Sequence, residues 1–253
     1  MNKKLYTIDL INNPITINDA TKGIVEYFYD ELICKFVQYR NETIHFVLGG
    51  DGTLLEILKK YDFTGLYIII KENGTVGFYS EFITLNDLKN ISFNDVIEEE
   101  FYPLLVEVDD KKLLAANEIL LVNNAKIVDF SLMINDGLNQ EYRSSGLIYS
   151  SALGSTGLSL SMGGPIVLNN KSSLLKIIAP TRYDKEINKA CSFVLGLEDE
   201  ISIKIKSGQL SLVIDGVVIE DIDKGVIKLK SLKTSYKLLH FNAKYLNNRI
   251  NRL

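Results

Sequence analysis

A strand-like run that ends in a glycine-flanked carboxylate and continues as a helix constrains the fold of this chain more than any other feature. The apolar residues 44–48 lead directly into Gly49-Gly50-Asp51-Gly52-Thr53, and a helix is expected over residues 54–61. The apolar, β-branched run 66–70 fits a strand that is buried on both faces of a parallel sheet. The first third of the chain is therefore predicted to be α/β.

The same glycine turn suits phosphoryl transfer. Glycine lets the backbone approach phosphate groups closely, and a helix N-terminus offers N–H donors and a partial positive charge. The carboxylate of Asp51 could hold a hydroxyl nucleophile in line or help to carry a metal ion. The alternative is a plain turn in which Asp51 or Thr53 caps the helix. The candidate phosphate-binding residues are Gly49, Gly50, Gly52 and Thr53.

The remaining segments predict two domains. A strand is expected within residues 5–10, a helix over 19–36, where apolar residues recur every four positions, and a short helix near 85–91. From residue 101 onward, short segments alternate apolar and polar residues and are punctuated by turns such as Asp215-Gly216, a pattern typical of an antiparallel β-sandwich. We therefore expect an α/β domain over 1–100, a sandwich-like domain over 101–237, and a tail, 238–253, that docks on the first domain.

Composition excludes several classes of protein. The formal net charge of −4 lacks the basic balance of a nucleic-acid binder. The two cysteines, Cys34 and Cys191, are far apart and have no Cys or His at the spacing of a zinc site. No apolar run approaches the length of a membrane span, so we expect a cytoplasmic protein without nucleic-acid or membrane partners. His45 and His240 stand alone in apolar or β-like contexts and are expected in the core rather than in catalysis.

Two further segments place polar groups among apolar neighbours. Residues 150–165 combine glycines and hydroxyl groups with a stop at Pro165, which suits close contact with a polar ligand; a flexible loop is the alternative. Asn117 and Glu118 lie between apolar flanks, where their side chains need polar partners. A nucleoside would supply such partners, and so would an arginine.

In their order along the chain, these segments resemble the signatures of the NAD kinase family, which phosphorylates the adenosine 2′-hydroxyl of NAD to make NADP. Residues 49–53 look like the family's GGDGT, residues 73–78 like its next glycine motif, Asn117-Glu118 like its NE pair, and residues 154–165 like its GST…GGP signature. GGDGT alone is shared with diacylglycerol and sphingosine kinases and with phosphofructokinases, whereas the ordered set is more specific. The resemblance implies an N-terminal α/β domain and an all-β, sandwich-like C-terminal domain.

The resemblance also implies roles by position. Asp51 would accept the proton of the ribose hydroxyl or orient it, Gly52 would lie against the dinucleotide, and Asn117 and Glu118 would bind adenine and ribose groups. The phosphoryl group would come from ATP or polyphosphate with Mg²⁺, and a homo-oligomer, a dimer or tetramer, would complete its sites across subunits. The other implied NAD-binding residues are Arg143, near the nicotinamide, and Ser145, Gly154, Ser155, Thr156, Ser161 and Ala179.

Three positions depart from the family pattern, and the first two of them normally hold the nicotinamide riboside in the family. Ser145 stands for an Asp, Leu158 for a Tyr, and Ser151-Ala152 for Thr-Pro. We therefore expect a weaker grip on the nicotinamide riboside. Two other functions stay open. A non-catalytic dinucleotide-binding module would fit Ser145 and Leu158, and a lipid kinase of the diacylglycerol or sphingosine type would need an apolar groove or basic membrane face that the sequence does not show.

Overall fold

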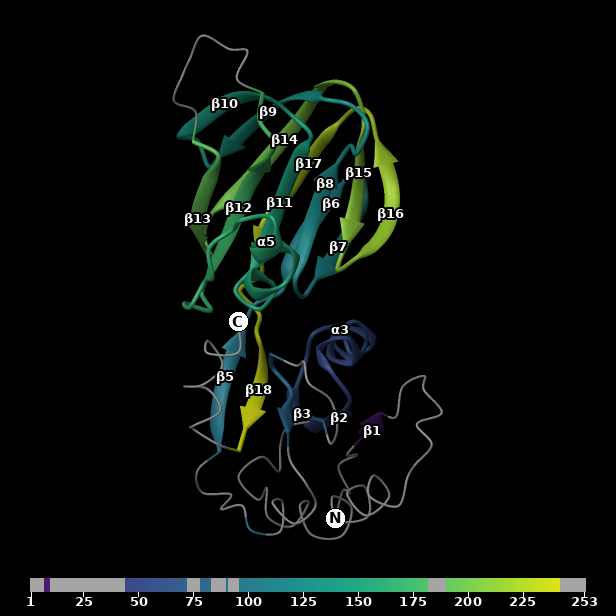
Figure 1. Cartoon of the computed structure of the whole chain (residues 1–253), viewed down its shortest axis with the longest axis vertical. Helices are drawn as coiled ribbons and strands as arrows, with labels where there is room; N and C mark the ends of the chain where they lie inside the picture. Colours follow the sequence, from purple (N-terminus) through teal and green to yellow (C-terminus); the bar gives the residue numbers. More distant parts are fainter. Residues whose placement is uncertain are drawn as a thin grey trace. The chain divides into compact units, whose positions relative to one another are not determined.

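The computed structural model describes residues 7–9, 44–71, 78–82, 90, 96–181 and 190–241. The chain divides into two compact units (Figure 1), one of residues 1–100 together with those from 236 onward, the other of residues 101–235. The predicted helix over 19–36 lies outside the described residues, as do most of the predicted helix near 85–91, residues 73–77 of the second glycine motif and the end of the predicted tail.

The first unit contains a largely parallel sheet. Strand β2 (Ile44–Leu48) pairs in parallel with β1 (Thr7–Asp9) and with β3 (Leu66–Lys71). Strand β3 also pairs in parallel with β18 (Tyr236–His240) and with β4 (Glu81–Phe82). The helix α3 (Asp51–Lys60) joins β2 to β3 and buries Leu54, Ile57 and Leu58 at the spacing of one helix face. The strands lie in the order β1, β2, β3, β18 and β5 (Ile97–Phe101), with β4 beside β3.

His45 belongs to the core of this unit, as the sequence predicts. Its side chain in β2 is 2% exposed, and its ring centroid lies 4.1 Å from that of Tyr61 and 4.7 Å from that of Tyr67. Burial, with smaller contributions from Tyr61 and Asp62, raises the pKa of Tyr67 above its ordinary value. The three rings therefore tie the end of α3 to the parallel sheet.

Within its described residues, the second unit consists of two six-stranded antiparallel sheets with an α5 turn (Leu158–Ser161) on the outside of one of them (Figure 1). One sheet has the order β10 (Leu138–Ser144), β9 (Val128–Ile134), β14 (Glu200–Ser207), β17 (Val226–Ser231), β6 (Leu104–Val108) and β7 (Lys111–Ala115). The other has the order β13 (Ser192–Gly196), β12 (Ser172–Ile178), β11 (Gly146–Ser151), β8 (Glu118–Val122), β15 (Leu210–Ile214) and β16 (Val217–Ile222).

The two sheets share one apolar core. Alternate residues of β9 and β14 point inward, which is why these segments alternate in the sequence. The phenolic oxygen of Tyr149 in β11 lies 3.0 Å from Ser231 Oγ in β17, so that a buried hydrogen bond links the sheets. The architecture confirms the predicted α/β part followed by an all-β, sandwich-like part. In the described residues, no helix has the length and apolar character needed to cross a membrane.

Two central strands depart from alternation because both of their faces are covered. Every residue of β8 and β11 is buried. On the outer face, Leu120, Val122 and Ile148 form a second apolar cluster, against which Met162 packs directly after α5. The glycine- and serine-rich segment is therefore a packed cover of the sheet, consistent with its interpretation as an ordered element rather than a flexible loop.

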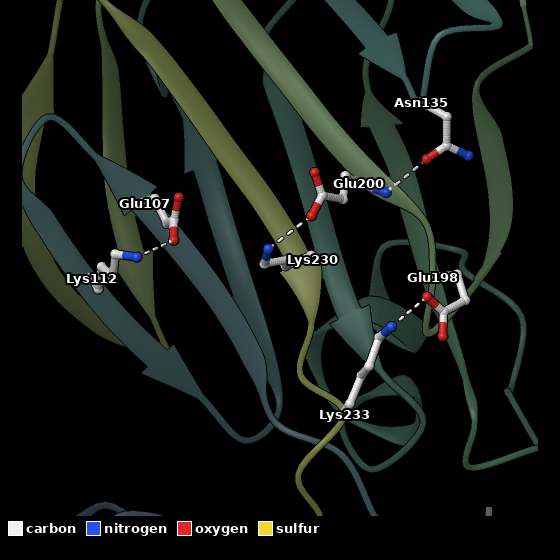
Figure 2. Close-up of polar contacts among 7 residues, drawn as sticks. All are labelled: Glu107, Lys112, Asn135, Glu198, Glu200, Lys230 and Lys233. Carbon is white, nitrogen blue, oxygen red and sulfur yellow. Dashed lines mark hydrogen bonds and ion pairs between the residues drawn. The ribbon is translucent and has the colours of Figure 1, made fainter.

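Cross-strand ion pairs line the sheet that contains β6, β7, β14 and β17 (Figure 2). Lys112 Nζ lies 2.8 Å from Glu107 Oε1, and Lys230 Nζ lies 2.8 Å from Glu200 Oε1, each pair directly opposite in register. The hydrogen bond from Lys230 lowers the pKa of Glu200. Both lysine side chains are exposed and belong to a solvated face of the sheet.

Candidate functional site

The glycine turn forms the first turn of α3. Gly50 is the N-cap in an extended conformation, and the N–H groups of Thr53 and Leu54 donate to its carbonyl oxygen over 3.0 and 3.3 Å. The helix begins at Asp51, three residues before the predicted start, because its first turn is polar and apolar periodicity begins only at Leu54.

Glycine stands at positions 49 and 52 of this turn for different structural reasons. A Cβ on Gly49 would lie 2.5 Å from Thr53 Oγ1, so the fold itself leaves no room for a side chain there. A Cβ on Gly52 would meet no atom within 4 Å among the described residues, and Gly52 is exposed. The packing of the chain therefore requires glycine at position 49, whereas position 52 borders open space that a ligand could occupy.

The carboxylate of Asp51 is held by a segment that lies far along the chain. Oδ2 accepts a hydrogen bond from the Phe78 N–H over 2.7 Å, and Oδ1 accepts from the N–H groups of Tyr79 and Ser80 over 3.1 and 3.2 Å and from the Ser80 hydroxyl over 3.0 Å. All four partners are donors, which suits an ionised carboxylate because it only accepts. The sequence does not predict this contact, and its one signal there is the glycine motif over 73–78, which leads into these donors.

In the second unit, Asn117 and Glu118 lie where the chain passes from β7 to β8. The Asp215 carboxylate accepts hydrogen bonds from the N–H groups of Ala116, Asn117 and Glu118 over 3.0, 2.7 and 3.1 Å. The Asn117 side-chain amide makes no hydrogen bond within the described part of the chain, whereas Glu118 is 7% exposed. Asp215 and Gly216 form the predicted hairpin turn, with φ values of 46° and 80°.

The GST segment, residues 154–156, packs directly against the backbone at Asn117. A Cβ on Gly154 would lie 2.2 Å from the Asn117 carbonyl oxygen, and the Ser151 N–H donates to the same oxygen over 2.9 Å. Ser155 is fully buried, and its hydroxyl donates to Ala152 O over 2.8 Å. Thr156 follows in the same short turn and is half-buried. The structure therefore brings Asn117, Glu118, Gly154, Ser155 and Thr156 together.

A second group of predicted residues lies elsewhere in this unit. Arg143 is exposed on β10, with Nε 3.7 Å from Asp129 Oδ1. The Ser145 N–H donates to Ile178 O over 3.2 Å, and Ala179 comes next with a φ of 44°. Arg143, Ser145 and Ala179 are thus neighbours at one end of β11.

Strand β11 separates this group from residues 116–118, which we call the Asn117 turn. Gly146, at one end, pairs with Ile178, and Ser150, near the other, pairs with Glu118. At the usual rise per residue, the two ends of β11 are about 17 Å apart. Ser161 is exposed at the end of α5, where its hydroxyl donates to Leu158 O over 2.7 Å. Within one chain, Arg143, Ser145 and Ala179 do not join the residues around Asn117.

Comparison with known proteins identifies the family. Residues 116–241 match the family model of the ATP-NAD kinase C-terminal domain. The NAD kinase of Caldicellulosiruptor saccharolyticus is 34% identical over 202 residues, which cover 78% of this chain and 76% of that protein. The chain belongs to the NAD kinase family. The NAD kinase of Ureaplasma parvum is 31% identical over 212 residues, covering 80% of this chain and 77% of its own.

Solved structures of NAD kinases and NADH kinases share the fold. A crystal structure of yeast NADH kinase complexed with NADH matches with a TM-score of 0.67 at 23% identity, over 83% of this chain and 65% of the yeast chain. An NAD kinase from Archaeoglobus fulgidus in complex with ATP matches with a TM-score of 0.63 at 24% identity, over 83% of both chains. The family resemblance of the sequence motifs and the two-part fold that it implies are both confirmed.

Proposed function

We propose that this protein is an NAD kinase that transfers a phosphoryl group from ATP or polyphosphate to the adenosine 2′-hydroxyl of NAD. The observation that carries the proposal is the Asp51 carboxylate, fixed by four donors at the start of α3. A carboxylate in such a position can align a hydroxyl nucleophile and take its proton. Catalysis would then rest mainly on positioning and electrostatics.

The pattern of hydrogen bonds favours Oδ2 as the reacting oxygen of Asp51. Oδ1 accepts three hydrogen bonds and Oδ2 accepts one. An ionised carboxylate has about four lone-pair sites, two on each oxygen, so Oδ2 keeps an acceptor site for the ribose hydroxyl. The open space beside Gly52 and the N-terminal end of the helix suit the phosphate groups next to that hydroxyl.

Mg²⁺ is proposed to enter with the phosphoryl donor. In the described ranges, no group of three or more His, Cys, Asp or Glu side chains is placed to hold a metal ion. Mg²⁺ in phosphoryl-transfer sites is commonly held by one or two carboxylates together with substrate phosphates and water. Because the open acceptor site of Asp51 Oδ2 is assigned to the ribose hydroxyl, the substrate phosphates and water would hold the ion. The ion would neutralise charge on the phosphates when it is bound.

The Asn117 turn is proposed to bind the adenosine. The Asn117 amide offers donors and an acceptor that no described residue engages, a combination that suits a base edge. Thr156 lies in the turn packed against it and supplies a hydroxyl group. The related yeast and archaeal structures contain NADH and ATP, both of which carry an adenosine.

The nicotinamide end is proposed to be bound by residues of a partner subunit. Arg143, Ser145 and Ala179 lie at the far end of β11 from the Asn117 turn. Every residue of β11 is buried, so a ligand cannot lie along this strand to connect the two groups. A homo-oligomer in which Arg143 of one subunit serves the site of the next would resolve this separation.

The test is NADP formation by the purified protein from NAD and Mg²⁺ with ATP or with polyphosphate, in parallel with the Asp51→Asn variant. We expect the substitution to lower kcat by about a hundredfold or more, since it removes the general base. Asparagine also places an NH₂ group against the N–H donors, so thermal unfolding and NAD binding of the variant must be checked.

The outcomes separate the three functions that the sequence leaves open. Product with the parent and almost none with a folded Asp51→Asn variant supports the kinase. NAD binding without product from either donor would instead indicate a non-catalytic module. Absence of both would direct the search to lipid acceptors. Comparing the two donors in the same assay identifies the phosphoryl source.

A further inference from the structure

We propose that Asp215 is a positioning residue for the adenosine-binding turn: its carboxylate fixes the backbone that carries Asn117 and Glu118. The sequence assigns Asp215 only to a hairpin turn, between β15 and β16. The inference rests on the proposed function, because it assumes that the Asn117 turn binds the adenosine of NAD.

Three consecutive N–H groups converge on this one carboxylate. Ala116 N donates to Oδ2 over 3.0 Å, and Asn117 N and Glu118 N donate to Oδ1 over 2.7 and 3.1 Å. In return, the Asp215 N–H donates to Glu118 O over 3.1 Å. Four hydrogen bonds therefore join the hairpin to the turn, across 97 to 99 residues of sequence for the three that reach the side chain.

The topology explains why these donors need a side-chain partner. Strand β7 pairs with β6 up to Ala115, and β8 pairs with β15 from Ile119 onward. Ala116 and Asn117 lie between β7 and β8, and Glu118 begins β8 opposite Ser150 of β11, where the chain passes from one sheet of the sandwich to the other. There the adjacent strands β6 and β15 offer no register partner, and Ala116 is fully buried. Buried N–H groups that lose their acceptor are costly, so removing the carboxylate should let this turn rearrange.

The hairpin turn itself does not require a carboxylate. Asp215 has a φ of 46°, a conformation that asparagine adopts as readily as aspartate. Asp215→Asn therefore retains the hairpin and one acceptor oxygen. It places an NH₂ group where Oδ2 or Oδ1 accepts a hydrogen bond, so at least one backbone donor loses its partner. The substitution therefore tests the hydrogen bonds between the Asp215 carboxylate and residues 116–118 separately from the conformation of the hairpin turn.

A matched control exists in the same sandwich. Asp109 has a φ of 50° in the hairpin between β6 and β7, is exposed, and accepts no hydrogen bond from the Asn117 turn. Asp109→Asn makes the same chemical change in the same backbone conformation. It should leave the kinetics and NAD binding as they are in the parent.

The experiment measures NADP formation and NAD binding by calorimetry for the parent, Asp215→Asn and Asp109→Asn. We expect Asp215→Asn to raise KM and Kd for NAD about tenfold, with kcat and the KM of the phosphoryl donor within about threefold of the parent. A general structural defect would instead raise the KM values of NAD and of the phosphoryl donor alike. Unchanged KM and Kd for NAD in a folded Asp215→Asn variant would overturn the inference.

A second variant covers the case in which Asp215→Asn does not fold. Asn117→Ala removes the side chain that Asp215 positions and leaves all three hydrogen bonds from the backbone in place. It should reproduce the NAD-specific loss, and unchanged NAD binding would refute the inference. If the parent binds NAD but makes no NADP, the kinase proposal fails. Weaker NAD binding by Asp215→Asn would still support the positioning role of Asp215.

Discussion

The hydroxyl group of Ser80 lies 3.0 Å from Asp51 Oδ1 and donates a hydrogen bond to it across 29 residues of sequence. The Ser80 N–H donates to the same oxygen over 3.2 Å, and the side chain of Ser80 is fully buried. Two of the four donors that fix the proposed catalytic carboxylate therefore come from one residue. The orientation of the Asp51 side chain therefore depends on residues 78–80 as well as on the glycine turn that carries it.

Ser80→Ala should impair catalysis more than NAD binding. The substitution removes one hydrogen bond from Oδ1 and leaves the three backbone donors, so the carboxylate can rotate away from the acceptor hydroxyl. We expect kcat for NADP formation to fall about three- to tenfold, with KM for NAD nearly unchanged. Steady-state kinetics with NAD as the varied substrate measure both parameters.

Ser173→Ala is the matched control for this prediction. Ser173 is 1% exposed, and its hydroxyl donates to Tyr149 over 3.0 Å in the sandwich core. Its loss should cost about 1 kcal/mol of stability without a change in kcat. Equal effects of the two serine substitutions on kcat would show that Ser80 acts only through stability.

Gly52→Ala should separate activity from stability. The added methyl group has free space in the folded chain, and alanine in a helical turn is more stable than glycine by about 0.5–1 kcal/mol. The variant should unfold at the same or a slightly higher temperature. If the dinucleotide or its phosphates lie against Gly52, kcat/KM for NAD should fall about tenfold or more.

Gly49→Ala provides the contrast. Its methyl group would lie 2.5 Å from Thr53 Oγ1 and 2.9 Å from Thr53 Cβ, so the first turn of α3 must shift. We expect a loss of about 1–3 kcal/mol in the free energy of unfolding. Thermal unfolding of both variants is the measurement. A destabilised Gly52→Ala protein would contradict the assignment of position 52 to ligand contact.

His240 predicts a pH dependence of stability. Its side chain is 2% exposed, with Nδ1 3.1 Å from Glu81 Oε1 and Nε2 3.2 Å from Glu99 Oε2. Burial by itself lowers the pKa of His240, but hydrogen bonds and charge interactions with the two carboxylates outweigh it and raise that pKa above its ordinary value. The imidazolium form is therefore favoured in the folded state.

A histidine with a raised folded-state pKa stabilises the fold most at low pH. Its contribution is fully present below the pKa of the unfolded chain, about 6.5, and is lost as pH rises through the folded-state pKa. The free energy of unfolding of the parent should thus fall relative to His240→Gln as pH increases above about 6.5. Urea unfolding of both proteins across this range tests the sign, and a constant difference would contradict it.

The sequence predicts the local elements well and the contacts between them poorly. Residues 66–70 are buried on both faces, and the alternating segments after residue 101 form antiparallel strands, because burial sets the spacing of apolar residues directly. The Asp-Gly pattern at 215–216 predicts a turn because backbone conformation is local. It does not predict that the same carboxylate accepts hydrogen bonds from residues near 117, since only the packing of the sandwich brings them together.

For the predicted site residues, too, the sequence indicates local motifs but not how they are arranged in space. Matching motifs by position places Arg143, Ser145 and Ala179 in one site with Asn117 and Thr156. The structure separates the two groups by the length of β11, which no local pattern reveals. The separation depends on the register of three strands. It leads to the prediction that two subunits share each site.

Subunit sharing predicts that two inactive variants restore each other. In a hybrid dimer of Asp51→Asn and Arg143→Ala subunits, one site carries both substitutions and the other carries neither, provided that Arg143 serves the partner's Asp51. Each variant alone should form little NADP. The hybrid, isolated through two different affinity tags, should regain about half of the parent activity.

If each chain instead forms its own site, every site of the hybrid carries one substitution, and activity stays at the level of the separate variants. The control for the purification is a dimer in which both subunits carry Asp51→Asn and each carries one of the two tags. Arg143 is exposed, and its ion-pair distance to Asp129 is 3.7 Å, so its removal should cost less than about 1 kcal/mol of stability. Recovery in the hybrid therefore reports the shared site rather than mutual stabilisation.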